Sequence, residues 1–220
     1  MRIRQGGRSR HERNFMTSSK SRGFSLLELM IVVLIGFTVA SMSVMALMPL
    51  FNRAHMDTAY DTTLMAMRNA RHLAITQSHQ YYVNFIPAAG AVPPQIQITY
   101  QPPAAVVGGI LPPVQQVMVY SLPTDINFAV MAGMPATAPD GFGTGLVPID
   151  FGQGLGAGSL NYVCFMPDGS SQDNLGNFNS GIIYMVRPAD TVYSARAITV
   201  WGATGRMRGW RLYPSGWVQQ

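Results

Sequence analysis

The sequence predicts an α+β protein in which a long N-terminal helix, membrane-spanning in its first half, packs on a C-terminal antiparallel β-sheet domain. Three patterns along the 220 residues indicate this architecture. An apolar run without charge occupies residues 29–50, and apolar or small residues then recur at helical spacing to about residue 78. Segments of alternating polarity follow from residue 81, which is the periodicity of half-buried strands.

The apolar run is long enough to cross a bilayer. It covers 22 residues from Leu29 to Leu50 without a charged side chain, and a helix needs about 20 residues for this. A cleaved secretory signal has an apolar core of only about 7–15 residues. We therefore predict a transmembrane helix over residues 24–51.

The basic residues are concentrated before this run. Removing residues 1–23 leaves eight basic and nine acidic residues, so the high pI gives no argument for a nucleic-acid-binding domain. By the positive-inside rule, the N-terminal segment stays in the cytoplasm and the rest of the protein lies outside. The basic residues of the segment are Arg2, Arg4, Arg8, Arg10, Arg13, Lys20 and Arg22.

The helix is expected to continue as an amphipathic segment over residues 52–79. Pro49 should kink it or break it locally, because proline removes one backbone hydrogen bond. The residues of the apolar face recur at i, i+3 and i+4: Met56, Ala59, Tyr60, Thr63, Leu64, Met67, Ala70, Ala74 and Ile75.

Residues 80–220 are predicted to form a β-rich globular domain. Two Pro/Gly-rich loops interrupt it, one within 87–113 and one over 131–159, and the glycines of 152–158 favour a flexible surface loop. A final hairpin is expected across residues 202–206. The predicted strands are 81–86, 95–100, 116–120, 162–166, 181–186, 195–201 and 207–213.

Glu28 is an acidic residue almost at the start of the predicted span. A carboxylate is costly in the hydrocarbon and less so at the interface. Two interpretations stay open from the residue alone: Glu28 faces lipid headgroups, or it pairs with a cation inside an assembly.

The residues Lys20-Ser21-Arg22-Gly23-Phe24-Ser25-Leu26-Leu27-Glu28-Leu29 resemble the class III signal of type IV pilins and type II secretion pseudopilins. The resemblance implies that prepilin peptidase cleaves after Gly23 and that Phe24 is N-methylated. It also implies that Glu28 meets the N-terminal amine of a neighbouring pilin subunit. Residues 1–23 would be a leader peptide, or residues 16–23 if Met16 is the true start.

The rest of the sequence resembles the GspH/FimT family of pseudopilins and minor pilins. The matching segments are Asn69–Ile75, Phe165–Ser170 and Thr204–Arg208. The resemblance implies a type IV pilin-like fold and a single-pass protein of the bacterial inner membrane with a periplasmic C-terminal domain. The leading functional hypothesis is a minor pseudopilin, a structural subunit of the periplasmic pseudopilus of a type II secretion system.

The alternative is a FimT-like minor type IV pilin that contacts DNA during uptake. In that branch a Gly-Arg-x-Arg motif is implicated in DNA contact, and Gly205-Arg206-Met207-Arg208 matches it. Arg206 and Arg208 would share one face of a strand, with Arg211 nearby and Trp201, Trp210 and Trp217 available for stacking. The same arginines could instead keep an edge strand soluble. A plain single-span anchor with an uncut leader is a third hypothesis.

The sequence predicts no enzyme, no cofactor and no metal site. His55, His72 and His79 lack the spacing and the further ligands of a zinc site. Asp168, Asp173 and Asn174 lack the order of a calcium-binding EF-hand loop. Cys164 is the only cysteine and is interpreted as a buried, unreactive thiol.

Overall fold

The computed structural model describes residues 24–100, 114–151, 161–173 and 175–220. The expected leader with Gly23, the glycine-rich segment 152–158 and Asn174 lie outside the described residues. The protein divides into two compact units, Met1–Leu47 and Met48–Gln220.

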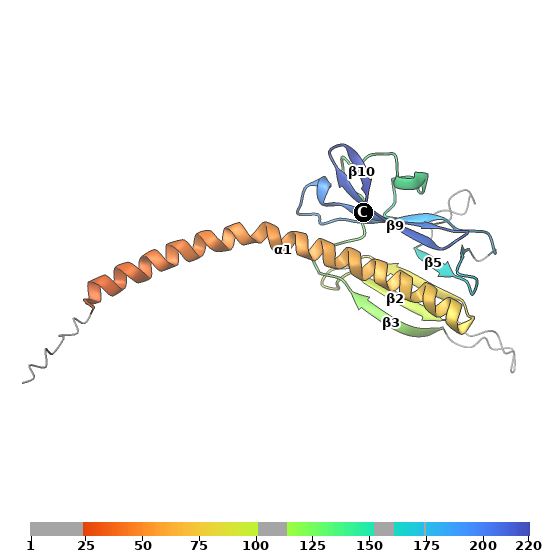
Figure 1. The fold of residues 1–220 in the computed structure, drawn as a ribbon, viewed down its shortest axis with the longest axis horizontal. Helices are drawn as coiled ribbons and strands as arrows, with labels where there is room; N and C mark the ends of the chain where they lie inside the picture. The colour runs from red at the N-terminus through yellow and green to blue at the C-terminus, as the bar shows by residue number, and fades with distance from the viewer. Residues whose placement is uncertain (1–23, 101–113, 152–160, 174) are drawn as a thin grey trace, which may run out of the picture. The chain divides into compact units, whose positions relative to one another are not determined.

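The helix α1 runs from Leu26 to Gln77, 52 residues, and matches the predicted extent closely (Figure 1). It passes through Pro49 without interruption, so of the two outcomes expected there, a kink or a local break, the break is wrong. Proline removes only one hydrogen bond from the helical ladder, and the apolar residues on both sides continue the helix. Ser78 ends it with a positive φ of 56°, and the His79 N–H donates to the Ala74 carbonyl at 3.3 Å, which is a Schellman-type cap.

The first sheet has the strand order β3-β2-β1-β5-β6, and its strand pairs are antiparallel. Alternate residues of β1 and β2 are buried, as the period-two pattern predicted. Its strands are β1 Tyr81–Ile86, β2 Gln95–Tyr100, β3 Gln115–Ser121, β5 Tyr162–Phe165 and β6 Ser171–Gln172.

The second sheet has the order β10-β9-β8-β7-β4 and is also antiparallel. All seven predicted strands are present, and the fold class is confirmed. Three further strands, β4, β6 and β10, have only two to four residues, which is too short for alternation to reveal them. The strands are β4 Ile149–Phe151, β7 Gly181–Met185, β8 Arg196–Trp201, β9 Arg206–Tyr213 and β10 Gly216–Gln219, and the short 3-10 helices are η1 Pro139–Gly141 and η2 Val192–Ser194.

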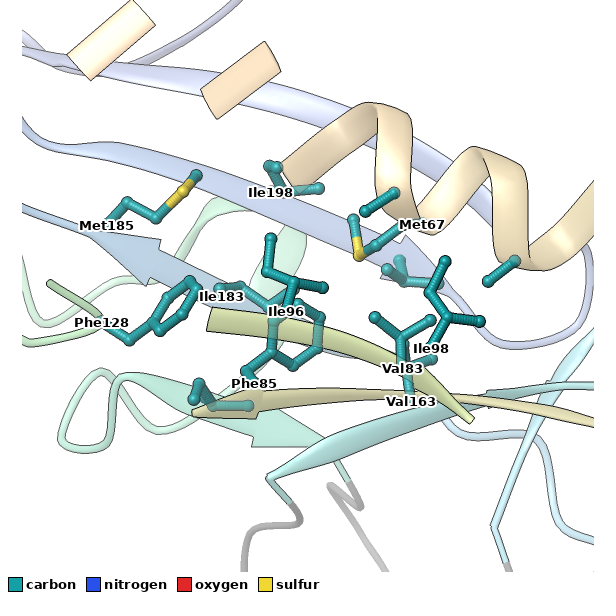
Figure 2. Packing of buried hydrophobic residues seen from close by; sticks show 14 of the residues in the cluster. Met67, Val83, Phe85, Ile96, Ile98, Phe128, Val163, Ile183, Met185 and Ile198 are labelled. Atoms are coloured by element: carbon teal, nitrogen blue, oxygen red, sulfur yellow. The ribbon is translucent and has the colours of Figure 1, made fainter. Parts of the chain in front are cut away.

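The main core joins the second half of α1 to both sheets. Figure 2 shows Met67 of α1 with Val83 and Ile98 from the first sheet and Ile198 from the second. Most of the predicted helical face is buried or half-buried here. Ile75 is an exception at 43% exposure, because it lines an open pocket between α1 and the turn that joins β8 to β9.

The second sheet is covered on its other face as well. The segment between β3 and β4 lies over it, so that Ala138 and Phe142 pack against Ile182 and Tyr184 of β7. All five residues of β7 are consequently buried. The second Pro/Gly-rich segment therefore contributes a packing layer in its part before β4.

Candidate functional site

The start of α1 is the first candidate site. Phe24 is 76% exposed and Glu28 lies exposed in the first helical turn. Every residue from Phe24 to Phe51 is exposed, and α1 is long and apolar enough to cross a membrane. An acidic side chain suits the N-terminal end of a helix, where the macrodipole is positive.

A pocket of about 510 Å³ on the second unit is the other candidate site. The helix contributes Arg68, Arg71, His72 and Ile75, which lie at i, i+3, i+4 and i+7 and so share one face of α1. The turn between β8 and β9 and the start of β9 contribute the other lining residues, Thr204–Met207. No aspartate or glutamate is among the lining residues.

Arg71 joins the three segments that carry the GspH/FimT resemblance. From α1, its Nε donates to the carbonyl of Gly169 at 2.9 Å, and its Nη2 donates to the carbonyl of Thr204 at 3.0 Å. Gly169 belongs to the turn before β6, and Thr204 to the turn between β8 and β9. The side chain of Arg71 therefore fixes both turns against the helix.

Both turns need glycine at this contact. Gly169 has φ +81° and Gly205 has φ +59°, in the left-handed region that residues with a Cβ rarely adopt. A Cβ on Gly205 would overlap the Gly169 carbonyl oxygen and approach Arg71 Nε to 2.7 Å. The motif glycine at 205 thus has a packing reason that is independent of any ligand.

Arg208 is paired within its own protein. Its Nη1 donates to Asp140 Oδ1 at 2.8 Å, and its guanidinium lies 5.3 Å from the centre of the Trp201 ring. Asp140 also accepts hydrogen bonds from the side chains of Thr199 and Trp201. This buried carboxylate holds η1 against the outer face of the second sheet.

Arg206 and Arg211 lie on opposite faces of β9. Strand alternation puts Arg206 on the same face as Arg208, as expected, and puts Arg211 on the other face. Arg211 is directly opposite Arg196, which is buried and bonded to Asp57 of α1 at 2.7 Å. The three arginines considered for DNA contact therefore do not form one surface. Of the three, Arg206 is the one that is exposed.

The tryptophans of the same region are used for packing. Trp210 and Trp217 pack against Ile182 and Tyr184, and the Trp210 indole N–H donates to Thr199 Oγ1 at 3.0 Å. Trp201 is 39% exposed and contacts Phe142 edge to face. Trp201 is accordingly the tryptophan most accessible to a ligand.

The histidines and aspartates considered for metals are apart. Within the described residues, no group of three or more His, Cys, Asp or Glu side chains is placed to hold a metal ion. His55 lies 3.0 Å from Asp125, His72 lines the pocket and His79 lies against the Tyr100 ring. Asp168 and Asp173 each accept backbone N–H groups of their own turn.

Cys164 is buried in β5 and forms no disulfide. Burial raises the pKa of its thiol to about 11. At neutral pH it is therefore a thiol rather than the reactive thiolate, which agrees with the structural role predicted for it.

Residues 18–44 match the family model for the prokaryotic N-terminal methylation motif. No curated protein and no solved structure matches this sequence. The motif stands at the start of a long apolar helix that continues into an antiparallel sheet domain, which is the arrangement of the type IV pilin fold. The protein is therefore type IV pilin-like, of a structural class that prepilin peptidase processes and that assembles with other pilins.

Proposed function

We propose that this type IV pilin-like protein is a minor pseudopilin of a type II secretion system. It would be anchored by a single pass in the bacterial inner membrane, with the sheet domain in the periplasm. The observation that supports a role in assembly is that the first half of α1 is apolar and exposed on all sides. A surface of this kind needs lipid or other helices as its partner.

The proposal gives Glu28 a specific partner. Cleavage after Gly23 would leave a methylated α-amine on Phe24, four residues before Glu28 in the sequence. Each charge is costly in lipid alone, and the two neutralise one another when helices of neighbouring subunits pack together. Glu28 would thus select helix partners that present their own N-terminus.

The convergence at Arg71 supports the GspH/FimT branch. Three segments distant in the sequence, Asn69–Ile75, Phe165–Ser170 and Thr204–Arg208, meet at one side chain through two hydrogen bonds. A set of matching segments that meet in space is better support than three unrelated matches. It supports a branch of the pilin-like class and favours neither secretion nor DNA uptake.

Processing and assembly can be tested in cells with an active prepilin peptidase. Mass spectrometry of the mature protein should find a peptide that begins with N-methylated Phe24 and no peptide containing Lys20. Glu28→Ala should abolish incorporation into the sheared filament fraction, and Glu28→Asp should retain part of it. An uncut leader, or undiminished incorporation of Glu28→Ala, would contradict the proposal.

Deletion of the gene separates secretion from uptake. A pseudopilin predicts that secreted proteins accumulate in the periplasm while DNA uptake is unchanged. The reverse pattern would favour the second candidate, a FimT-like minor pilin. One observation favours that candidate: Arg206 is exposed and lines a pocket together with Arg68 and Arg71.

Contact with DNA is testable with one substitution. Arg206→Ala should lower retention of DNA on a filter at low salt if the second candidate is correct, because phosphate contacts are electrostatic and salt-dependent. Arg211→Ala is the matched control, since Arg211 lies on the opposite face of β9. Absence of retention by the unaltered protein would leave secretion as the proposal.

A further inference from the structure

The pocket between α1 and the β8–β9 turn has an excess of positive charge. Arg68, Arg71 and Arg206 line it together with His72. The five ion pairs of the described residues involve other cationic side chains: His55, Arg187, Arg196 and Arg208. The three arginines of the pocket thus lack a carboxylate partner within the described part of the protein.

The undescribed segments of the domain cannot supply one either. Residues 101–113, 152–160 and 174 contain no aspartate and no glutamate. No acidic side chain of the described domain therefore forms an ion pair with the arginines of the pocket. A partner that carries negative charge would find these cations free of a competing anion.

Arg71 is held in place before any partner binds. Its two bonds to the carbonyls of Gly169 and Thr204 use two of the five N–H donors of the guanidinium. The others stay available in a fixed planar arrangement that suits a carboxylate. Because the side chain is already ordered, binding would cost little further rotamer entropy.

We propose that this pocket binds a carboxylate presented by a neighbouring subunit of the same assembly. The carboxylate can belong to an Asp or Glu side chain or to the C-terminus of the neighbour. Ile75 and Met207 supply apolar lining beside the arginines, which suits the aliphatic part of a peptide segment. The inference rests on the proposed assembly function and names a contact of the sheet domain, separate from the pairing at Glu28.

A protein carboxylate fits the pocket better than a nucleic acid. Nucleic-acid backbones are bound by a series of phosphate contacts along a surface. Here two arginines outside the pocket are already committed, Arg208 to Asp140 and Arg196 to Asp57. Arg68, Arg71 and Arg206 instead gather around one concave site.

The absence of lysine after residue 20 permits a selective test. Lys20 is the only lysine in the sequence, so Arg68→Lys gives the mature protein a single side-chain amine. A water-soluble carbodiimide joins such an amine to a carboxylate in direct contact; an amide bond forms, and the reagent takes up the elements of water as a urea. Arg68 is exposed, and no acidic residue stands three or four positions from it on α1.

The reaction is run on membranes that contain the full mature protein with its assembled partners. We expect the amine introduced by Arg68→Lys to form an amide with a carboxylate of an identified pilin-like subunit, located by mass spectrometry. A second variant, Arg206→Lys, should reach the same carboxylate from the opposite wall. The matched control is Thr76→Lys, an exposed position of the same helix outside the pocket lining, which should give no such product.

Each outcome decides the inference. A product at an Asp or Glu side chain and one at a C-terminus both support it and identify the source. No product from either the Arg68→Lys or the Arg206→Lys variant, or a product confined to Asp residues of the same molecule, overturns it. Phenylglyoxal modifies accessible arginine side chains. If Arg68 were protected from it and nuclease treatment removed that protection, the pocket would be assigned to nucleic acid, and the inference would be overturned.

The same samples distinguish a failure of this inference from a failure of the proposed function. The N-terminus at Phe24 and the presence of the protein in the sheared filament fraction report processing and assembly. If the Arg68→Lys variant is processed and assembled but gives no cross-linked product, only the pocket inference is contradicted. An unprocessed protein contradicts the proposed function, whatever the introduced amine does.

Discussion

The two halves of helix α1 are both rich in apolar residues but differ in how much of these residues the protein itself buries. From Leu26 to Leu47 every side chain is exposed, including Leu34 at 68% and Phe37 at 72%. From Met48 to Gln77 one face is buried against the sheets, with Ala66, Met67 and Ala70 at 0%. Both halves are rich in apolar residues, so composition alone does not set the difference.

The difference lies in where the partner is. The second half finds it within the same molecule, and its small residues Ala59, Ala66, Ala70 and Ala74 allow the sheets to approach closely. The first half has no such partner among the described residues. Exposed apolar surface costs about 25 cal/mol per Å² in water, so this half must be covered by lipid or by other subunits.

Methionine substitutions along the helix give the largest expected contrast. Met67→Ala removes a fully buried side chain and should lower the free energy of unfolding of the domain by about 2–5 kcal/mol. Met65→Ala, on the same half at 54% exposure, should change it by less than about 0.5 kcal/mol. Met45→Ala, in the first half, should leave it unchanged.

The measurement is chemical unfolding of the mature protein in detergent. Tryptophan fluorescence reports on the domain alone, because Trp201, Trp210 and Trp217 all lie in or beside the second sheet. A loss of domain stability in Met45→Ala comparable with that in Met67→Ala would remove the distinction between the halves.

Two glycines with the same backbone angle test the contact between the second half and its turns. Gly205 and Gly90 both have φ +59°, but only Gly205 has neighbours at its missing Cβ. Gly90→Ala should cost about 1–2 kcal/mol, the ordinary strain of a left-handed residue. Gly205→Ala should cost about 2–4 kcal/mol, because a clash with the Gly169 carbonyl and Arg71 adds to that strain. Equal losses of stability would show that the turn relaxes freely.

Arg71 and Arg68 provide a third contrast on one helix. Arg71→Ala removes two charge-assisted hydrogen bonds and should lower the free energy of unfolding by about 1.5–3 kcal/mol. Arg68→Ala should change it by less than about 0.5 kcal/mol, since Arg68 is exposed. The same unfolding measurement applies, and a large loss in Arg68→Ala would contradict the assignment of Arg68 to partner binding.

The elements that could be predicted from the sequence are those with a local pattern of apolar residues. Periodicity identified the helix and seven strands, because alternation and helical spacing are local properties of residues such as Val83 and Met67. It missed β4, β6 and β10, whose two to four residues contain too little of a pattern. Pro49 was expected to kink the helix or break it locally, and the helix is not broken there.

The site was less accessible to sequence reasoning. Arg206 and Arg208 were placed on one face by alternation, but Arg211 was grouped with them although its odd spacing puts it on the other face. Arg208 and Asp140 are 68 positions apart in the sequence, so no local pattern of residues could predict that they pair. The role of Arg71 had a weak signal in the sequence, because Arg71 lies within Asn69–Ile75, one of the segments that resemble the GspH/FimT family.

The smallest expected effect concerns the contact of His55, in the second half of α1, with Asp125. Burial alone would raise the pKa of Asp125, but hydrogen bonds from His55 at 3.0 Å and Arg187 at 2.7 Å outweigh it and lower that pKa. A carboxyl whose folded pKa is depressed contributes stability above its unfolded pKa of about 3.9. This contribution is lost as the pH falls through the folded value.

Asp125→Asn should therefore lower the free energy of unfolding by about 1 kcal/mol at pH 7, since the group is partly exposed. The difference between the variant and the unaltered protein should start to close below about pH 4, because the protonated aspartate resembles asparagine. Unfolding curves at a series of pH values measure it, with Asp61→Asn as a control, because no ion pair involves Asp61 among the described residues. A gap that persists undiminished at pH 3 would mean that Asp125 acts through shape rather than charge.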